Sequence, residues 1–208
     1  SPLQDGGLLL IDAGAELDGY ASDITRTFPV NGRFTGEQRA IYELVLTAQQ
    51  AAIAKVRPGG HFNDPHDAAV RTLTEGLAAL GLLPGGAVED LIKEEQHKPF
   101  YMHRTGHWLG MDVHDVGIYK NGEDWRVFEP GMVTTVEPGL YLPAGGQVID
   151  AHWARLGVRL ETELAERWQR IGVRIEDDVL VTADGDEVLS AAAPKEIAEI
   201  EALMREGR

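Results

Sequence analysis

Apolar side chains recur at intervals of three and four between residues 41 and 56, which is the spacing of one face of an α-helix. Thr35-Gly36-Glu37-Gln38 resembles a capping box, so the helix is predicted to begin there. Arg57-Pro58-Gly59-Gly60 supplies the residues that end it. The stripe expected to face the core comprises Ile41, Leu44, Val45, Ala48, Ala52, Ile53 and Val56.

Three further helices follow from similar signals. One is predicted to begin at Asp64-Pro65, with Pro65 at its first position, and to run to Gly81. A short helix is expected over residues 88–96, and an amphipathic helix over residues 194–205 closes the chain. Between the last two, strands are expected to dominate.

Strand-like runs make up much of the remainder. Leu8–Ile11 is continuously apolar, Val133–Val136 is rich in β-branched residues, and residues 172–181 alternate before an apolar end. No linker or low-complexity segment interrupts the chain. We therefore expect a single α+β domain over residues 1–208.

The first pair of strands carries the clearest chemical signal. An Asp-Gly step lies between two strand-like runs and favours a hairpin. If the hairpin folds about the midpoint of Leu17 and Asp18, Asp12 lies directly opposite Asp23. Like charges at opposed positions are destabilising, and a bound cation would reverse the sign of that interaction. The pattern therefore predicts a metal ion beside both aspartates.

Other potential metal ligands follow later in the chain. Residues 103–114 contain three of the seven histidines, Glu137 ends a strand before Pro-Gly, and Arg174 and Glu176 alternate onto one strand face. Four carboxylates and one imidazole form an oxygen-rich set that suits manganese, with cobalt or zinc as possible occupants. The candidate ligands of a two-metal hydrolase are Asp12, Asp23, His107, Glu137 and Glu176.

Two alternatives exist for these positions. The hexamer that ends at Glu161 is nearly the same as the one that ends at Glu176, so either glutamate could be the fifth ligand. Glu176 is favoured because Glu161 leads into a helical-looking stretch, residues 162–169, whereas Glu176 lies in a strand-like run. His103 and His107 have the spacing of a two-histidine zinc face on a helix, but nearby glycines disfavour a helix and no HExxH motif is present.

Four segments resemble the motifs of the Xaa-Pro aminopeptidase and prolidase family of pita-bread metallopeptidases. They are IDAGAELDGYASDITRTFPVNGRFT, HWLGMDVHDVG, TTVEPGLY and GVRIEDDVLVT. The resemblance extends from about Leu8 to the C-terminal helix and implies a pita-bread catalytic fold. It also implies that segments of the family's fold before Leu8 are missing from this chain, so we expect a fragment that persists with its N-terminal piece as a non-covalent partner, or as a homo-oligomer.

The resemblance also implies roles for the metal ligands. Asp12 would bind one metal through both oxygens, Asp23 and Glu176 would bridge two metals, and His107 with Glu137 would bind the second. A hydroxide between the metals would be the nucleophile.

Further residues are implied to act on the substrate. His103 and His114 would line the substrate site, Arg174 would support the bridging carboxylates, and Tyr141 would hydrogen-bond near the metals. His114 would donate to the developing oxyanion and Glu137 would carry a proton to the leaving nitrogen. The catalytic candidates are thus His103, His114, Glu137 and Arg174.

These implications favour release of an N-terminal residue that precedes proline in a peptide substrate. The alternatives are an Xaa-Pro dipeptidase of the same chemistry, and an inactive fragment or non-catalytic binding module of the same fold.

The composition limits the kinds of partner and site that we expect for this chain. A net charge of −15 argues against a nucleic-acid partner, because phosphate contacts require clustered Lys and Arg. With no cysteine, the chain forms no disulfide and no thiolate metal site. No apolar run is long enough to cross a bilayer, so we expect no membrane association and a cytoplasmic protein.

Overall fold

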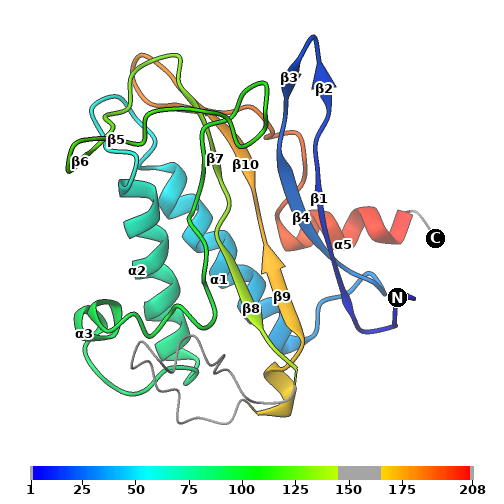
Figure 1. The fold of residues 1–208 in the computed structure, drawn as a ribbon. Coiled ribbons are helices and arrows are strands. Elements are labelled where there is room, and N and C mark those ends of the chain that lie inside the picture. Colours follow the sequence, from blue (N-terminus) through cyan, green and yellow to red (C-terminus); the bar gives the residue numbers. More distant parts are fainter. Residues whose placement is uncertain (1, 145–164, 207–208) are drawn as a thin grey trace.

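The computed structural model describes residues 2–144 and 165–206, with helices packed against a set of paired strands (Figure 1). Helix α1 (Gly36–Ile53) begins as predicted, because the side chain of Thr35 accepts a hydrogen bond from the amide of Gln38 and the side chain of Gln38 accepts one from the amide of Thr35. The predicted apolar stripe is buried except at the half-buried Leu44.

Helix α2 (Asp64–Ala79) packs along α1. Gly76 allows the close approach, because a Cβ atom there would lie 2.2 Å from the Leu44 side chain. Pro65 is the second residue of α2 rather than the first, since Asp64 already begins the helix.

The remaining helices are shorter than the sequence predicted. Helix α3 (Val88–Lys93) ends before residue 96, because Glu95 has a left-handed backbone with φ 56°. Helix α5 (Ile197–Glu206) begins after Pro194, whose carbonyl oxygen accepts a hydrogen bond from an arginine on β4. A 3-10 helix, η1 (Glu166–Trp168), precedes the last strands.

Strands β1 (Leu8–Ala13) and β4 (Ile24–Pro29) form an antiparallel pair, extended at its tip by β2 (Glu16–Leu17) and β3 (Tyr20–Ala21). The hairpin predicted from the Asp-Gly step is therefore present. Figure 1 shows it rising beside β10 with its tip far from the helices.

The register of this hairpin differs from the prediction. Asp18 and Gly19 have φ values of 53° and 86°, as the central residues of a type I′ turn require, so the chain reverses at this step rather than one residue earlier. Asp12 consequently lies opposite Thr25, and the prediction that it directly faces Asp23 is wrong. Side chains alternate with a period of two, so the two aspartates still share one face.

A second antiparallel arrangement is interrupted in its middle. Strand β7 (Val133–Val136) pairs with β10 (Asp177–Val181), and β8 (Gly139–Leu142) pairs with β9 (Ile171–Arg174). Both pairings share one register, which places Glu137 opposite Glu176 at the interruption. Strand β11 (Asp186–Val188) pairs with β10, and the short strands β5 (Lys120–Asn121) and β6 (Asp124–Trp125) pair with each other.

Hydrogen bonds connect these parts into a row across the molecule. The amide of Glu176 donates to the carbonyl of Thr25 over 3.1 Å, and the amide of Glu137 donates to the carbonyl of Thr105 over 2.7 Å. The row therefore runs from Asp12 through Thr25, Glu176 and Glu137 to the segment that carries His107. Residues far apart in the sequence reach one place because neighbouring strands are in register.

A buried ion pair anchors the end of the chain beside this row. Arg26 and Asp177 are 2.7 Å apart, and Asp177 also receives a hydrogen bond from Lys195 over 2.6 Å. Burial opposes ionisation, but hydrogen bonds from Lys195, Ser190 and Arg26 outweigh it and lower the pKa of Asp177. The acid therefore stays charged and holds the segment before α5 against the strands. None of the helices in the described ranges is long and apolar enough to span a membrane.

Candidate metal and catalytic site

All five side chains predicted to bind metal lie together. Their nitrogen and oxygen atoms form two groups, each with atoms within 4.8 Å of one another. The first contains Asp12, Asp23 and Glu176, and the second contains His107, Glu137 and Glu176. Glu176 is shared by both groups, whereas the alternative ligand Glu161 lies outside the described residues.

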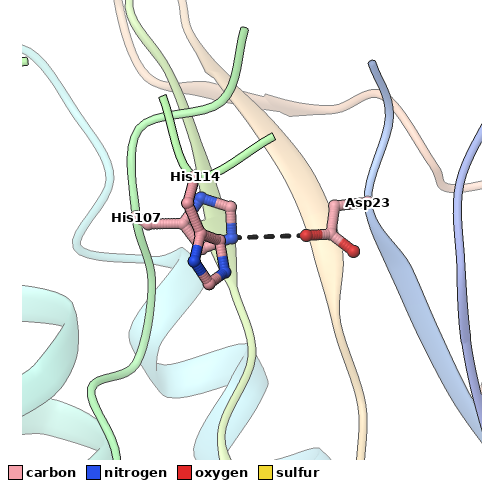
Figure 2. Close-up of side chains that lie close together, drawn as sticks. All are labelled: Asp23, His107 and His114. Carbon is pink, nitrogen blue, oxygen red and sulfur yellow. Dashed lines mark ion pairs between the residues drawn. The ribbon is translucent and has the colours of Figure 1, made fainter. Parts of the chain in front are cut away.

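The imidazole of His107 is prepared to act as a ligand. Its Nδ1 lies 2.9 Å from the carbonyl oxygen of Trp108, which can only accept, so Nδ1 carries the proton. The buried Nε2 has no hydrogen-bond partner within the described part of the chain. It faces Asp23 at 3.3 Å and Glu137 at 3.7 Å, and Figure 2 shows the first contact. A metal ion is a natural partner for this lone pair.

The two opposed glutamates are held in an environment that disfavours their charge. Glu176 is 2% exposed. Burial, followed by the nearby charge of Glu137, raises the pKa of Glu176 to about 8. Burial is also the main cause that raises the pKa of Glu137 to about 7. The fold thus holds these two carboxyl groups close together although burial and neighbouring charges disfavour their ionisation.

The aspartates of the hairpin differ in environment. Burial and the charge of Asp12 raise the pKa of Asp23. The side chain of Asp12 is 49% exposed and forms an ion pair with Arg174. Arg174 thus offsets charge at the hairpin end of the site.

Arg174 begins a chain of contacts that reaches His103. Its Nη1 donates to the hydroxyl of Tyr141 over 3.4 Å, and this hydroxyl lies 2.9 Å from Nε2 of His103. The Nδ1 of His103 lies 2.7 Å from the carbonyl of Arg104 and therefore donates, which leaves Nε2 to accept from Tyr141. Burial lowers the pKa of His103, so the neutral ring fits this pattern. Both nitrogens of His103 are thus engaged by the protein.

His114 lies on an exposed loop against the metal-ligand candidates. Its ring centroid is 4.1 Å from that of His107, and Asp23, His107 and His114 form a further close group (Figure 2). The preceding Val113 has φ 63°, an uncommon conformation for a β-branched residue. The carboxylate of Asp115 accepts from the amides of Met111 and Val116 and holds this turn. The loop thereby presents His114 beside His107.

Two buried threonines also contact the candidate ligands, and the sequence analysis did not single them out. Thr25 donates to Glu176 over 2.6 Å, and Thr135 donates to Glu137 over 3.3 Å. The signal in the sequence was the run Ile-Thr-Arg-Thr after Asp23, because polar residues on both faces of a strand are unusual for a simple amphipathic pattern.

Oxygen-rich groups with one unpartnered imidazole nitrogen have the donor chemistry of a divalent-cation site. Protein cations do not balance the negative charge of the four candidate carboxylates, of which Glu176 is buried and shared by both groups. In the described ranges, Arg174 is the one arginine or lysine that forms an ion pair with a candidate ligand. The residues present therefore fit bound metal.

Comparison with known proteins gives the family. The model of metallopeptidase family M24 matches residues 1–183, and the chain belongs to this family. The Xaa-Pro aminopeptidase of Haemophilus influenzae is 50% identical over 204 residues, covering 98% of this chain and 43% of that protein. The Xaa-Pro aminopeptidase of Escherichia coli is 47% identical over 203 residues, covering 97% of this chain and 42% of that protein.

Solved structures agree with the sequence relatives. Aminopeptidase PepP of Pseudomonas aeruginosa superposes with a TM-score of 0.89 at 56% identity, covering 99% of this chain and 43% of that one. A glutamate-to-alanine variant of Escherichia coli aminopeptidase P in complex with substrate superposes with a TM-score of 0.86 at 45% identity, covering 100% of this chain and 43% of that one. The family resemblance and the α+β pita-bread fold are confirmed, and the chain spans less than half the length of these relatives.

Proposed function

We propose that this chain carries the centre of an Xaa-Pro aminopeptidase that uses two divalent metal ions, most favourably manganese. The observation that carries the proposal is the pair of ligand groups that share the buried Glu176. Two adjacent groups with a common carboxylate are what a bridged pair of cations requires.

The five candidate ligands divide between the two positions. Asp12, Asp23 and Glu176 would hold one cation, while His107, Glu137 and Glu176 would hold the other. When bound, the cations supply Lewis acidity and an activated water at neutral pH. The raised pKa values of Glu137 and Glu176 support this assignment, because a cation would stabilise the ionised forms that burial disfavours.

The chain's own groups would handle the proton and the developing charge. Glu137 is a candidate ligand of the second cation and would carry a proton to the leaving nitrogen. His114 is exposed beside His107 and can donate a hydrogen bond to the oxyanion, a kind of contact worth about 3–4 kcal/mol in other enzymes. Arg174 and Tyr141 would hold Asp12 and His103 in place.

Two features of the substrate bear on its recognition. The Xaa-Pro amide has no N–H, so an enzyme must recognise the pyrrolidine ring by shape. A free α-amino group would be attracted to the half-exposed carboxylate of Asp12.

The test is hydrolysis of an Xaa-Pro-Xaa tripeptide by metal-stripped and manganese-restored chain, with Asp23→Asn as the comparison variant. We expect cleavage that disappears on chelation, returns with manganese and is lost in Asp23→Asn. Cleavage of only the Xaa-Pro dipeptide would assign a dipeptidase instead. Bound metal without cleavage of either peptide would indicate a chain that does not act alone, or a binding module, and would refute the proposed activity of this chain.

A further inference from the structure

Thr25 occupies the centre of the row of candidate ligands although it is neutral. It lies opposite Asp12 in the hairpin, and on its other side its carbonyl accepts from the amide of Glu176. The residue is fully buried, with 0% exposure. It therefore separates two carboxylates within the row.

The hydroxyl of Thr25 contacts two charged side chains. It donates its one hydrogen to Oε2 of Glu176 over 2.6 Å, and it accepts from Nε of Arg174 over 3.1 Å. Glu176 belongs to both ligand groups, and Arg174 pairs with Asp12. One hydroxyl thus fixes the shared ligand directly and a second ligand through the guanidinium.

We infer that Thr25 is a positioning residue of the metal site, whose hydroxyl holds the carboxylate of Glu176 and the guanidinium of Arg174 in the orientation that cation binding needs. This inference rests on the proposed function. Groups that orient a ligand without binding the metal commonly change metal affinity about 10- to 100-fold when they are removed.

The side chain can be tested separately from the backbone. Valine has nearly the shape of threonine but has no hydroxyl. The bond from the Glu176 amide to the Thr25 carbonyl, and the bond from Arg26 to the same carbonyl, use main-chain oxygen that Thr25→Val retains. The substitution therefore removes the two side-chain contacts and keeps the strand connection.

Thr27 provides a matched control on the same strand. It is also 0% exposed, and it lies two residues from Thr25 on the same face. Its hydroxyl donates to the Arg174 carbonyl over 3.0 Å and accepts from the Arg174 amide over 3.2 Å. Thr27→Val should cost similar folding stability, because it also leaves buried polar groups unsatisfied, but it removes no contact with a ligand side chain.

The experiment is calorimetric titration of Mn²⁺ into the metal-stripped 208-residue chain and its variants, with thermal unfolding of each metal-free protein as a check on folding. In Thr25→Val, we expect the dissociation constant of the more weakly bound of the two Mn²⁺ ions to rise about 10- to 100-fold. Thr27→Val should bind close to the wild-type chain. Thr25→Ser should retain the affinity because it keeps the hydroxyl, and Thr25→Ala should lose it.

The Ser and Ala variants decide the outcome if Thr25→Val does not fold, since the two differ only in the hydroxyl. Wild-type affinity in the variants that lack the hydroxyl would overturn the inference, and so would an equal loss in Thr27→Val. If the wild-type chain binds no Mn²⁺, the proposed function itself is overturned. If the wild-type chain binds Mn²⁺ and the Thr25 variants bind it equally well, only the inference about Thr25 is overturned.

Discussion

The hairpin of β1 and β4 and the interrupted pair of β7–β8 with β9–β10 each bring two carboxylates to the site, but in different ways. In the hairpin, Asp12 faces Thr25 within the β1–β4 ladder, Asp23 lies just before β4, and an arginine pairs with the half-exposed Asp12. In the interrupted pair, Glu137 faces Glu176 where the pairing stops, and the pKa values of both rise. Arg174 offsets charge at the hairpin end, whereas no arginine or lysine in the described ranges forms an ion pair with Glu137 or Glu176.

Removal of the shared carboxylate should have the largest effect. We expect Glu176→Gln to lose metal from both groups and to lower tripeptide cleavage by about 1,000-fold, which corresponds to roughly 4 kcal/mol. The metal-free variant should unfold at a higher temperature, because it no longer buries a carboxylate opposite Glu137. Metal analysis, kinetics and thermal melts would measure this, with the exposed Glu187→Gln as the control. Retention of both metals in Glu176→Gln would contradict the shared-ligand assignment.

The pH dependence should also separate the two ends. Because the folded-state pKa values of Glu137 and Glu176, about 7 and 8, lie above the ordinary 4.5, the folded metal-free chain binds more protons than the unfolded chain. Its stability should therefore fall by up to a few kcal/mol as pH rises from about 4.5 to 8. Manganese should reverse the trend, since binding requires the ionised carboxylates.

Thermal melts from pH 5 to 9, with chelator and with Mn²⁺, would measure this effect. A metal-free chain that gains stability across that range would show that the glutamates are not held against their charge.

At the hairpin end, Arg174→Gln should reduce metal affinity or activity about 10- to 100-fold. Lysine should not restore the loss, because its single ammonium cannot contact Asp12, Thr25 and Tyr141 together as the guanidinium does. Titration of Mn²⁺ into Arg174→Gln and Arg174→Lys tests this. Full affinity in the lysine variant would mean that only the positive charge matters.

The smallest effect should come from the hairpin turn. Gly19 has φ 86° and open space around its Cβ position, so Gly19→Ala should cost only roughly 1–2 kcal/mol of backbone strain and leave metal binding intact. Gly14→Ala is the contrasting variant, because a Cβ atom at Gly14 would lie only 1.8 Å from the carbonyl oxygen of Ser22, the residue before Asp23. Gly14→Ala should therefore be less stable and bind metal more weakly. Equal melts and affinities for the two variants would show that hairpin geometry does not position the aspartates.

The sequence predicted which side chains lie together better than it predicted the arrangement of the strands. An error of two residues in the hairpin register left Asp12 and Asp23 on one face, because side chains alternate with a period of two. The opposition of Glu137 and Glu176 was not predictable, since it depends on a register shared by two strand pairs that are separated in the sequence.

Local patterns also could not identify the groups that hold the ligands. The guanidinium of Arg26 donates five hydrogen bonds. One is accepted by the neighbouring Thr25 on β4, and four are accepted by oxygens of residues 176–177 and 193–194, which only the folded structure brings near Arg26. Thr25 meets Glu176 across 151 positions of sequence. The predicted substrate role of His103 stays a prediction, because both of its ring nitrogens are engaged by Arg104 and Tyr141.

The most direct test of the account is a crystal structure of the manganese-loaded chain with anomalous scattering data. We expect two anomalous peaks that share Glu176, one beside Asp12 and Asp23 and the other beside His107 and Glu137. A single peak, or peaks away from Glu176, would contradict a two-metal site built on the interrupted strands.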